Sequence, residues 1–222
     1  MDMSKTVLII GSETLLGRKL IEVYLNSAYK VIAPVMTTQE TLKRSEKTNL
    51  QVIPWNRSSL VSAKTVMREV LRNLSSLDKA IVVNPEISET SVLEECETEK
   101  LDEALYTYTH GTLYLIKEIL DYFKKQEKGI LAFAETEKGL STESIIPSII
   151  RGGFHNMAES ILLSSSGSDI RCAFTSRLTE MEDYAQFIKG ILKSGEPKIN
   201  GEWLQFSEKK ALFQSLPIIK RK

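Results

Sequence analysis

Short continuous apolar runs alternate along this chain with segments in which apolar residues recur every three or four positions. Val7 to Ile10 form the first run, and Leu16, Leu20 and Val23 then follow at helical spacing. A continuous apolar run is typical of a strand buried on both faces, whereas the wider spacing is typical of an amphipathic helix. The alternation therefore predicts a parallel sheet whose strands are joined by right-handed helical crossovers.

The same alternation continues to the end of the sequence. Further strands are expected at 31–33, 50–53, 80–83, 130–133, 170–174 and 202–206. No internal repeat or linker rich in proline and glycine divides the chain, and 222 residues suit one domain. We therefore expect a single α/β domain over residues 1–222, with helices covering both faces of a seven-stranded, mostly parallel sheet.

The charge balance and the two cysteines limit the classes of partner. The chain carries 29 basic and 29 acidic side chains, and it has no long basic block of the kind that nucleic acids and anionic membranes require. No stretch reaches the roughly 18 apolar residues of a membrane span, and the first residues lack the features of a secretion signal. Cys96 and Cys172 stand far apart without a nearby His, which favours reduced thiols over a disulfide or a zinc site. We expect a cytoplasmic protein that binds neither nucleic acid nor membrane.

A glycine turn follows the first expected strand, the context in which such a turn binds dinucleotide phosphates. Gly11 suits the tight turn, and Gly17 allows close packing of the helix that follows. The glycine that lets a pyrophosphate approach the backbone is missing, because Thr14 or Leu15 stands in its place. The helix N-terminus still offers N–H groups to an anion, so a working dinucleotide site and a relic of one both remain open. The candidate phosphate-binding residues are Gly11, Ser12, Thr14, Leu15, Leu16 and Gly17.

Two later segments bear on the adenosine half of a dinucleotide. Where an acidic residue would bind the ribose, the sequence has Thr37 and Thr38, whose hydroxyls are hydrogen-bonding candidates. Trp55 and Asn56 follow the third expected strand. The Trp55 ring either stacks on adenine or packs against the sheet, and we favour packing.

With these motifs in this order, the chain resembles the short-chain dehydrogenase/reductase family over most of its length. VLIIGSETLLGRKL resembles the family's opening, AIVVNPEIS is similar to the segment that normally ends in Asn-Asn-Ala-Gly, and KINGEWLQF resembles its last strand. The resemblance implies a three-layer, doubly wound Rossmann fold with the strand order 3-2-1-4-5-6-7. It also makes NAD(P) a candidate cofactor, with Asn56, Asn84 and Arg151 as further candidate cofactor-binding residues.

The same resemblance implies that the family's catalytic groups are missing. Pro147 falls where the family has its proton-transferring tyrosine, and Arg151 falls where it has a lysine. The position of the catalytic serine falls on Ala134 or Glu135, and the relay asparagine aligns with Tyr108. We therefore assign no catalytic residue and no metal ligand.

The substrate lid of the family is also reduced in this sequence. After the sixth expected strand the family has a loop of some twenty or more residues, whereas here a helix capped by Thr179 follows almost at once. We therefore expect a truncated lid region near residues 175–180.

We predict a catalytically inactive or atypical member of the family, with a nucleotide-sensing or protein-interaction role. The alternative is an active NAD(P)-dependent oxidoreductase with a rearranged site, in which Arg151, Thr136 and Glu135 replace the usual groups. The resemblance further implies a homodimer or homotetramer through helices 101–126 and 148–165, with a protein partner as a further candidate. His110 and His155 lie in these helices, and we interpret both as solvated or hydrogen-bonded interface residues.

Overall fold

The computed structural model describes residues 5–36, 49–74, 76–87, 92–136, 145–164, 169–177, 180–194 and 199–207. Within them the strands are β1 (Thr6–Ile10), β2 (Lys30–Val35), β3 (Leu50–Pro54), β4 (Lys79–Val83), β5 (Ile130–Thr136), β6 (Ile170–Ser176) and β7 (Trp203–Phe206). They form one sheet in the order β3-β2-β1-β4-β5-β6-β7, and every neighbouring pair is parallel. The predicted fold and strand order are confirmed.

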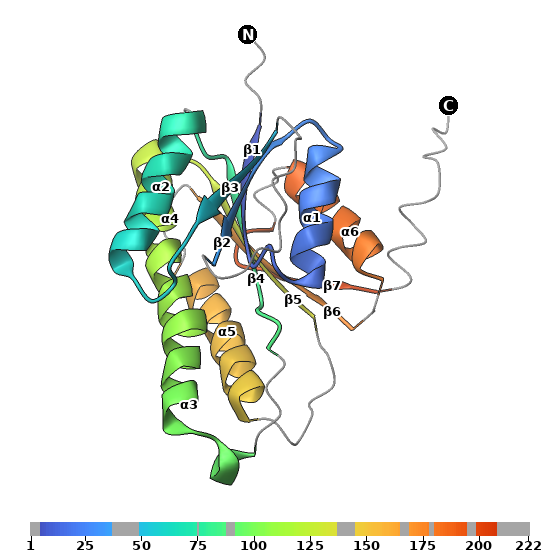
Figure 1. The fold of residues 1–222 in the computed structure, drawn as a ribbon. Coiled ribbons are helices and arrows are strands. Elements are labelled where there is room, and N and C mark those ends of the chain that lie inside the picture. Colours follow the sequence, from blue (N-terminus) through green and yellow to red (C-terminus); the bar gives the residue numbers. More distant parts are fainter. Residues whose placement is uncertain are drawn as a thin grey trace, which may run out of the picture.

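Helices cover both faces of this sheet (Figure 1). One face carries α1 (Leu15–Leu25) and α6 (Met181–Ser194), and the other carries α2 (Leu60–Leu74), α4 (Gly111–Gln126) and α5 (Ile145–Leu163). The shorter elements are α3 (Thr98–Ala104), the 3-10 turn η1 (Leu93–Glu95) and the π-helical segment η2 (Leu105–His110). Among the described residues, no helix has both the length and the apolar character needed to cross a membrane.

The continuous apolar runs form strands because both faces of the sheet are covered. In β1 every residue is buried. Val7 and Ile9 belong to the core under α1 and α6, whereas Leu8 and Ile10 belong to the core under α2, α4 and α5. Since successive side chains of a strand point to opposite faces, a strand between two helical layers needs apolar residues at every position.

The helix predicted over 101–126 is a longer, interrupted element. It begins with α3 at Thr98, continues through η2 and ends with α4 at Gln126. Gly111 starts α4 at a point of close contact, because a Cβ atom there would lie 2.2 Å from the carbonyl oxygen of Arg57. The glycine therefore lets this element press directly against the loop after β3.

The helix predicted over 148–165 instead spans Ile145–Leu163. It begins before Pro147 because a residue in the first turn needs no intrahelical partner for its backbone nitrogen, so proline is tolerated there. Further along, β6 ends at Ser176 and α6 begins at Met181. Thr179, the predicted helix cap, lies outside the described residues.

Candidate functional site

Both glycines of the turn after β1 are required by the backbone geometry. Gly11 has a φ of +84°, a left-handed conformation that favours glycine, and a Cβ atom there would lie 2.8 Å from the carbonyl oxygen of Val83. A Cβ atom on Gly17 would lie 2.1 Å from the carbonyl oxygen of Gly11. The first turn of α1 thus packs directly on the glycine turn.

Two N–H groups at the N-terminus of α1, where a phosphate would bind, already have partners within the chain. Thr14 caps the helix: its buried hydroxyl oxygen accepts a hydrogen bond from Gly17 N–H at 2.9 Å and donates one to the Gly11 carbonyl at 2.8 Å. The Leu15 N–H donates to Glu86 Oε1 at 3.3 Å. Glu86 therefore places a negative charge at the positive end of the helix dipole, where the family would hold the cofactor's pyrophosphate.

The other side chains of the turn do not face a ligand site. Ser12 is fully buried, and its hydroxyl donates to the Pro34 carbonyl at 3.3 Å. Leu16 is buried in the core, whereas the Leu15 side chain is 44% exposed. Leu15 is thus the one apolar side chain of the turn that covers its solvent side.

A buried ion pair joins the loop after β3 to the glycine turn. Arg57, only 3% exposed, is paired with Glu13 of the glycine turn. The centre of its guanidinium group lies 5.0 Å from the Trp55 ring and 5.6 Å from the Tyr108 ring, so cation–π contacts add to the ion pair. Trp55 is fully buried, which confirms that its ring packs against the core.

Among the remaining predicted residues, Asn56 and Asn84 each make hydrogen bonds that shape the fold. Asn56 accepts a hydrogen bond from Ser58 N–H through its Oδ1 at 3.0 Å, so its side chain shapes the turn before α2. Asn84 N–H donates to the Ala134 carbonyl at 2.9 Å, which extends the ladder between β4 and β5. Arg151 lies in α5, and Thr37, like Thr38, lies outside the described residues.

Several buried polar atoms along this edge have no hydrogen-bond partner among the described residues. They are Glu13 Oε2, Trp55 Nε1, Arg57 Nε and Asn84 Oδ1. Such atoms cost stability until a ligand or a water molecule satisfies them.

The structure pairs Glu135 with His155, a contact that the sequence pattern does not reveal. Glu135, at the end of β5, is 7% exposed, and its Oε1 lies 3.0 Å from Nδ1 of His155 on α5. The His155 ring stacks on Trp203 of β7 at 4.6 Å. The His110 ring, by contrast, lies tilted against Tyr106 at 4.8 Å and stacks on Tyr114 at 6.4 Å. A carboxylate on Nδ1 orients the imidazole ring.

Among the described residues, no three His, Cys, Asp or Glu side chains are grouped as a metal site.

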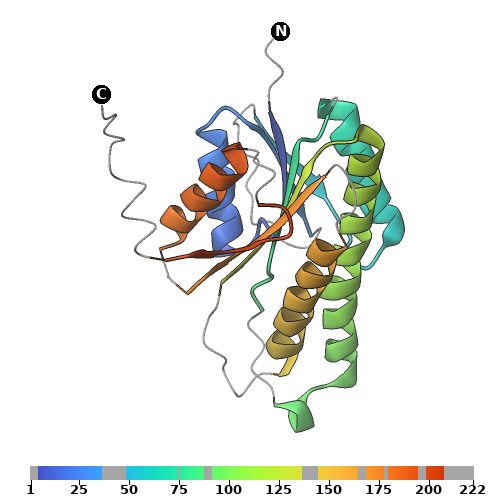
Figure 2. The same cartoon turned by 180° about the vertical axis from the view of Figure 1, so that it is seen from behind.

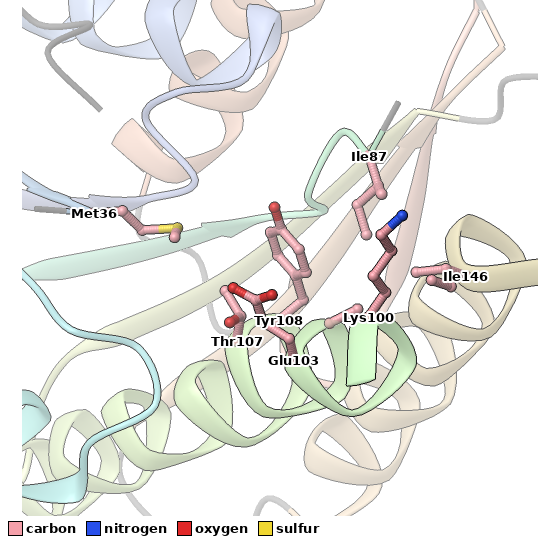
Figure 3. A pocket seen from close by; sticks show the side chains of 8 residues that line it. Met36, Ile87, Lys100, Glu103, Thr107, Tyr108 and Ile146 are labelled. Carbon is pink, nitrogen blue, oxygen red and sulfur yellow. The ribbon is translucent and has the colours of Figure 1, made fainter. Parts of the chain in front are cut away.

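A pocket of about 200 Å³ opens at the carboxyl edge of the sheet (Figure 3). It lies between the end of β2, the segment after β4, the α3–η2 helix and the start of α5. Its lining residues are Met36, Ile87, Lys100, Glu103, Ala104, Thr107, Tyr108 and Ile146. Sequence reasoning identified only Tyr108 among them, as the residue aligned with the relay asparagine.

Comparisons with known proteins agree with this fold. Residues 5–145 match the family model described as short chain dehydrogenase. Similar solved structures include ElxO with NADP bound (16% identity, TM-score 0.73, covering 91% of this chain and 97% of that one). Levodione reductase has 10% identity and a TM-score of 0.76, and the match covers 94% of this chain and 98% of that one. The short-chain dehydrogenase/reductase (glucose/ribitol dehydrogenase) from Brucella melitensis has 14% identity and a TM-score of 0.77, and the match covers 91% of this chain and 94% of that one. A search of curated proteins found no match. At these identities the structural likeness shows the fold alone.

Proposed function

Because the chain belongs to the short-chain dehydrogenase family, we propose that it is a non-catalytic member in which the residues of the cofactor cleft bind one another instead of NAD(P). We infer that it acts by binding a small ligand or a protein partner. The observation that carries this proposal is the hydrogen bond from Leu15 N–H to Glu86 Oε1 at the start of α1. A pyrophosphate needs the same N–H group and would meet the charge of Glu86.

The pair of Glu13 and Arg57 supports the same proposal. The Arg57 guanidinium group lies over both the Trp55 ring and the Tyr108 ring, so an adenine ring stacked on either one would have to displace it. Breaking a buried ion pair costs about 3–5 kcal/mol when one charge is left without a partner. That cost corresponds to roughly two to four orders of magnitude in affinity, so a micromolar cofactor site would become a site of about millimolar affinity.

The residues at the family's catalytic positions are also unsuited to hydride transfer. The family chemistry needs a tyrosine that passes a proton to the carbonyl substrate. Pro147, which falls at that position, has no proton to give. Arg151 falls where the family has the lysine that acts on this tyrosine, and with Pro147 in place of the tyrosine there is no hydroxyl for Arg151 to act on.

A second candidate function is supported by Glu135. If the chain is an active oxidoreductase with a rearranged site built on Arg151, Thr136 and Glu135, the pair of Glu135 and His155 supplies a positioned acid–base group at the end of β5. This alternative requires NAD(P) to bind, because the hydride must come from the cofactor.

One titration tests the proposal against this alternative. The wild-type protein is mixed with NAD⁺, NADH, NADP⁺ and NADPH in turn, each at about 1 mM, and its melting temperature is recorded. A ligand at about 100 times its Kd adds about 2.7 kcal/mol to the free energy of unfolding. A cofactor with a Kd near 10 μM would therefore raise the melting temperature clearly. We expect no shift and no oxidation of NADH or NADPH with carbonyl substrates. A saturable shift with any one cofactor would contradict the proposal.

We also propose that the chain assembles as a homodimer or homotetramer through the two elements predicted at 101–126 and 148–165. Both elements cover the same face of the sheet (Figure 2). They expose large apolar side chains, namely Tyr106 and Leu113 on one and Ile149 and Leu163 on the other. Exposed apolar groups concentrated on neighbouring helices are typical of a protein interface.

For the location of the protein we propose the cytoplasm. Cys96 and Cys172 are both free thiols, and free thiols are usual where the compartment is reducing. Imaging of a fluorescent fusion tests this directly, and a fusion found outside the cytoplasm would overturn it.

A further inference from the structure

We propose that the pocket at the carboxyl end of β2 binds a small organic amine with an apolar body. This inference rests on the proposed function, because a bound dinucleotide would enter the same edge of the sheet. Figure 3 shows the arrangement that motivates it: Met36 and Ile146 lie at opposite ends, and Lys100, Glu103, Thr107 and Tyr108 rise from one helix between them.

The size of the pocket sets the size of the ligand. Its volume is about 200 Å³, and a water molecule occupies roughly 30 Å³ in the liquid. The space therefore suits a molecule of roughly ten non-hydrogen atoms, well below the 300–1,000 Å³ that drug-sized ligands need. A whole dinucleotide is too large for it.

The polar groups of the pocket all come from one helix face. Lys100, Glu103, Ala104 and Thr107 recur at intervals of three or four residues along α3 and η2, so they lie on the same side of this element. The facing walls are formed by the apolar side chains of Met36, Ile87 and Ile146. A ligand that fits both walls has an apolar body and a polar group at one end.

The charge of that polar group follows from the ion pairs. Lys100 Nζ is paired with Glu97 Oε1 at 3.5 Å, so its charge is compensated. In the part of the chain that the structure describes, no ion pair involves Glu103. The uncompensated charge on the lining is therefore the carboxylate of Glu103. This charge favours a cationic ligand.

The number of acceptors matches an ammonium group. A primary ammonium has three N–H donors. The two carboxylate oxygens of Glu103 lie beside the hydroxyl of Thr107, whereas the Tyr108 hydroxyl lies farther along the lining (Figure 3). Thr107 is only 6% exposed, which places its hydroxyl away from bulk solvent. A charge-assisted hydrogen bond to Glu103 would provide selectivity over a neutral analogue. An anionic analogue would be repelled.

The test uses three probes of nearly equal shape, namely 2-phenylethylamine, 2-phenylethanol and 3-phenylpropionate, in phosphate buffer. Their affinities for the full-length protein are measured by calorimetry, and the methyl signal of Met36, assigned with Met36→Leu, reports the site by NMR. We expect the amine to bind at least about tenfold more tightly than the alcohol, the carboxylate to bind most weakly, and the Met36 signal to shift with the amine.

Two variants separate the carboxylate of the pocket from the general charge of its helix. Glu103→Gln is expected to bring the amine to the affinity of the alcohol. Glu99→Gln removes an exposed acid from the same helix that does not line the pocket, and it is expected to leave the preference unchanged. Equal binding of all three probes, an unmoved Met36 signal, or a preference that survives Glu103→Gln would each overturn the inference.

The outcomes also distinguish this inference from the proposed function. If neither the amine nor any nicotinamide cofactor binds, the inference is wrong while the proposed function stands. If a nicotinamide cofactor binds and the amine displaces it with the expected preference, the proposed function is wrong while the amine site stands.

Discussion

Gly17 is the residue at which the backbone most narrowly limits the sequence. A Cβ atom there would lie 2.1 Å from the carbonyl oxygen of Gly11, and both groups are backbone, so no side-chain rotation relieves the clash. We expect Gly17→Ala to lower the free energy of unfolding by more than about 2 kcal/mol. Gly152→Ala is the matched control: no atom lies within 4 Å of the new methyl group, so it should add about 0.5–1 kcal/mol in the helix. Urea denaturation of both variants measures the difference, and equal effects would show that the turn is not packed as described.

Lys79 is a residue at which pH should change stability. Burial lowers the pKa of its amine below the ordinary value of 10.5, and this outweighs the attraction of Asp78. Between the pKa of Lys79 in the folded chain and its pKa in the unfolded chain, the unfolded chain binds more protons. The free energy of unfolding therefore rises with pH through that interval. Below the interval, the cost of burying the charge is constant. We expect Lys79→Met to be more stable than wild type at pH 7 and to lose this advantage as the pH approaches 10.5.

The measurement for Lys79 compares the two proteins at each pH. Tyr24 and Tyr29 have pKa values raised by burial, so their contribution to stability is lost at alkaline pH. Since both proteins contain these tyrosines, the difference between them isolates Lys79. A difference that does not change with pH would contradict the explanation.

At the scale of elements, the sequence predicted the strands, which follow from local periodicity. It did not predict the π-helical segment or the exact start of α5. The strands were predictable because a strand buried on both faces is apolar at every position, as β1 is. The π-helical segment η2 was not, because its i→i+5 pattern has no signature in a spacing of three to four residues. The helix predicted from residue 148 begins at Ile145, because the first helical turn accepts Pro147.

The position of Pro147 gives a prediction about α5. Replacing it with alanine should lower the free energy of unfolding by only about 0.4–1 kcal/mol, because the main effect is a more flexible unfolded chain. Gly153→Pro, in the middle of the same helix at an open position, should cost about 3 kcal/mol because it removes a backbone hydrogen bond. Circular dichroism during thermal unfolding compares the two. A similar, large loss for both would place Pro147 inside the helix rather than in its first turn.

At the scale of the whole molecule, the candidate site depends on contacts between distant segments. Glu86 is 71 residues from Leu15, and Arg57 is 44 residues from Glu13. The sequence identified the glycine turn and its missing glycine, because those are local features. It gave no sign that the chain's own carboxylates would occupy the turn, since this depends on how the segments after β3 and β4 come together at one edge of the sheet.

The proposed assembly also belongs to this scale. Leu113 is a large apolar residue 38% exposed on α4, and a charge placed there should disrupt an interface formed by that helix. We expect Leu113→Glu to convert the dimer or tetramer into a monomer in light scattering coupled to size exclusion. Lys64→Glu, on α2 and outside the proposed interface, should leave the assembly intact. A wild-type monomer, or an assembly unaffected by Leu113→Glu, would rule this interface out.

The central claim is that Glu86 and Leu15 close the phosphate site at the start of α1. Titration with NADPH, followed by its fluorescence, tests this most directly in the wild type, in the double variant Leu15→Gly with Glu86→Ala, and in the control Glu99→Gln. The account predicts that the wild type and the control bind only at millimolar concentration, and that the double variant binds at least about tenfold more tightly, because the N–H groups of the helix are free to hold phosphate. Micromolar binding by the wild type, or no gain in the double variant, would contradict it.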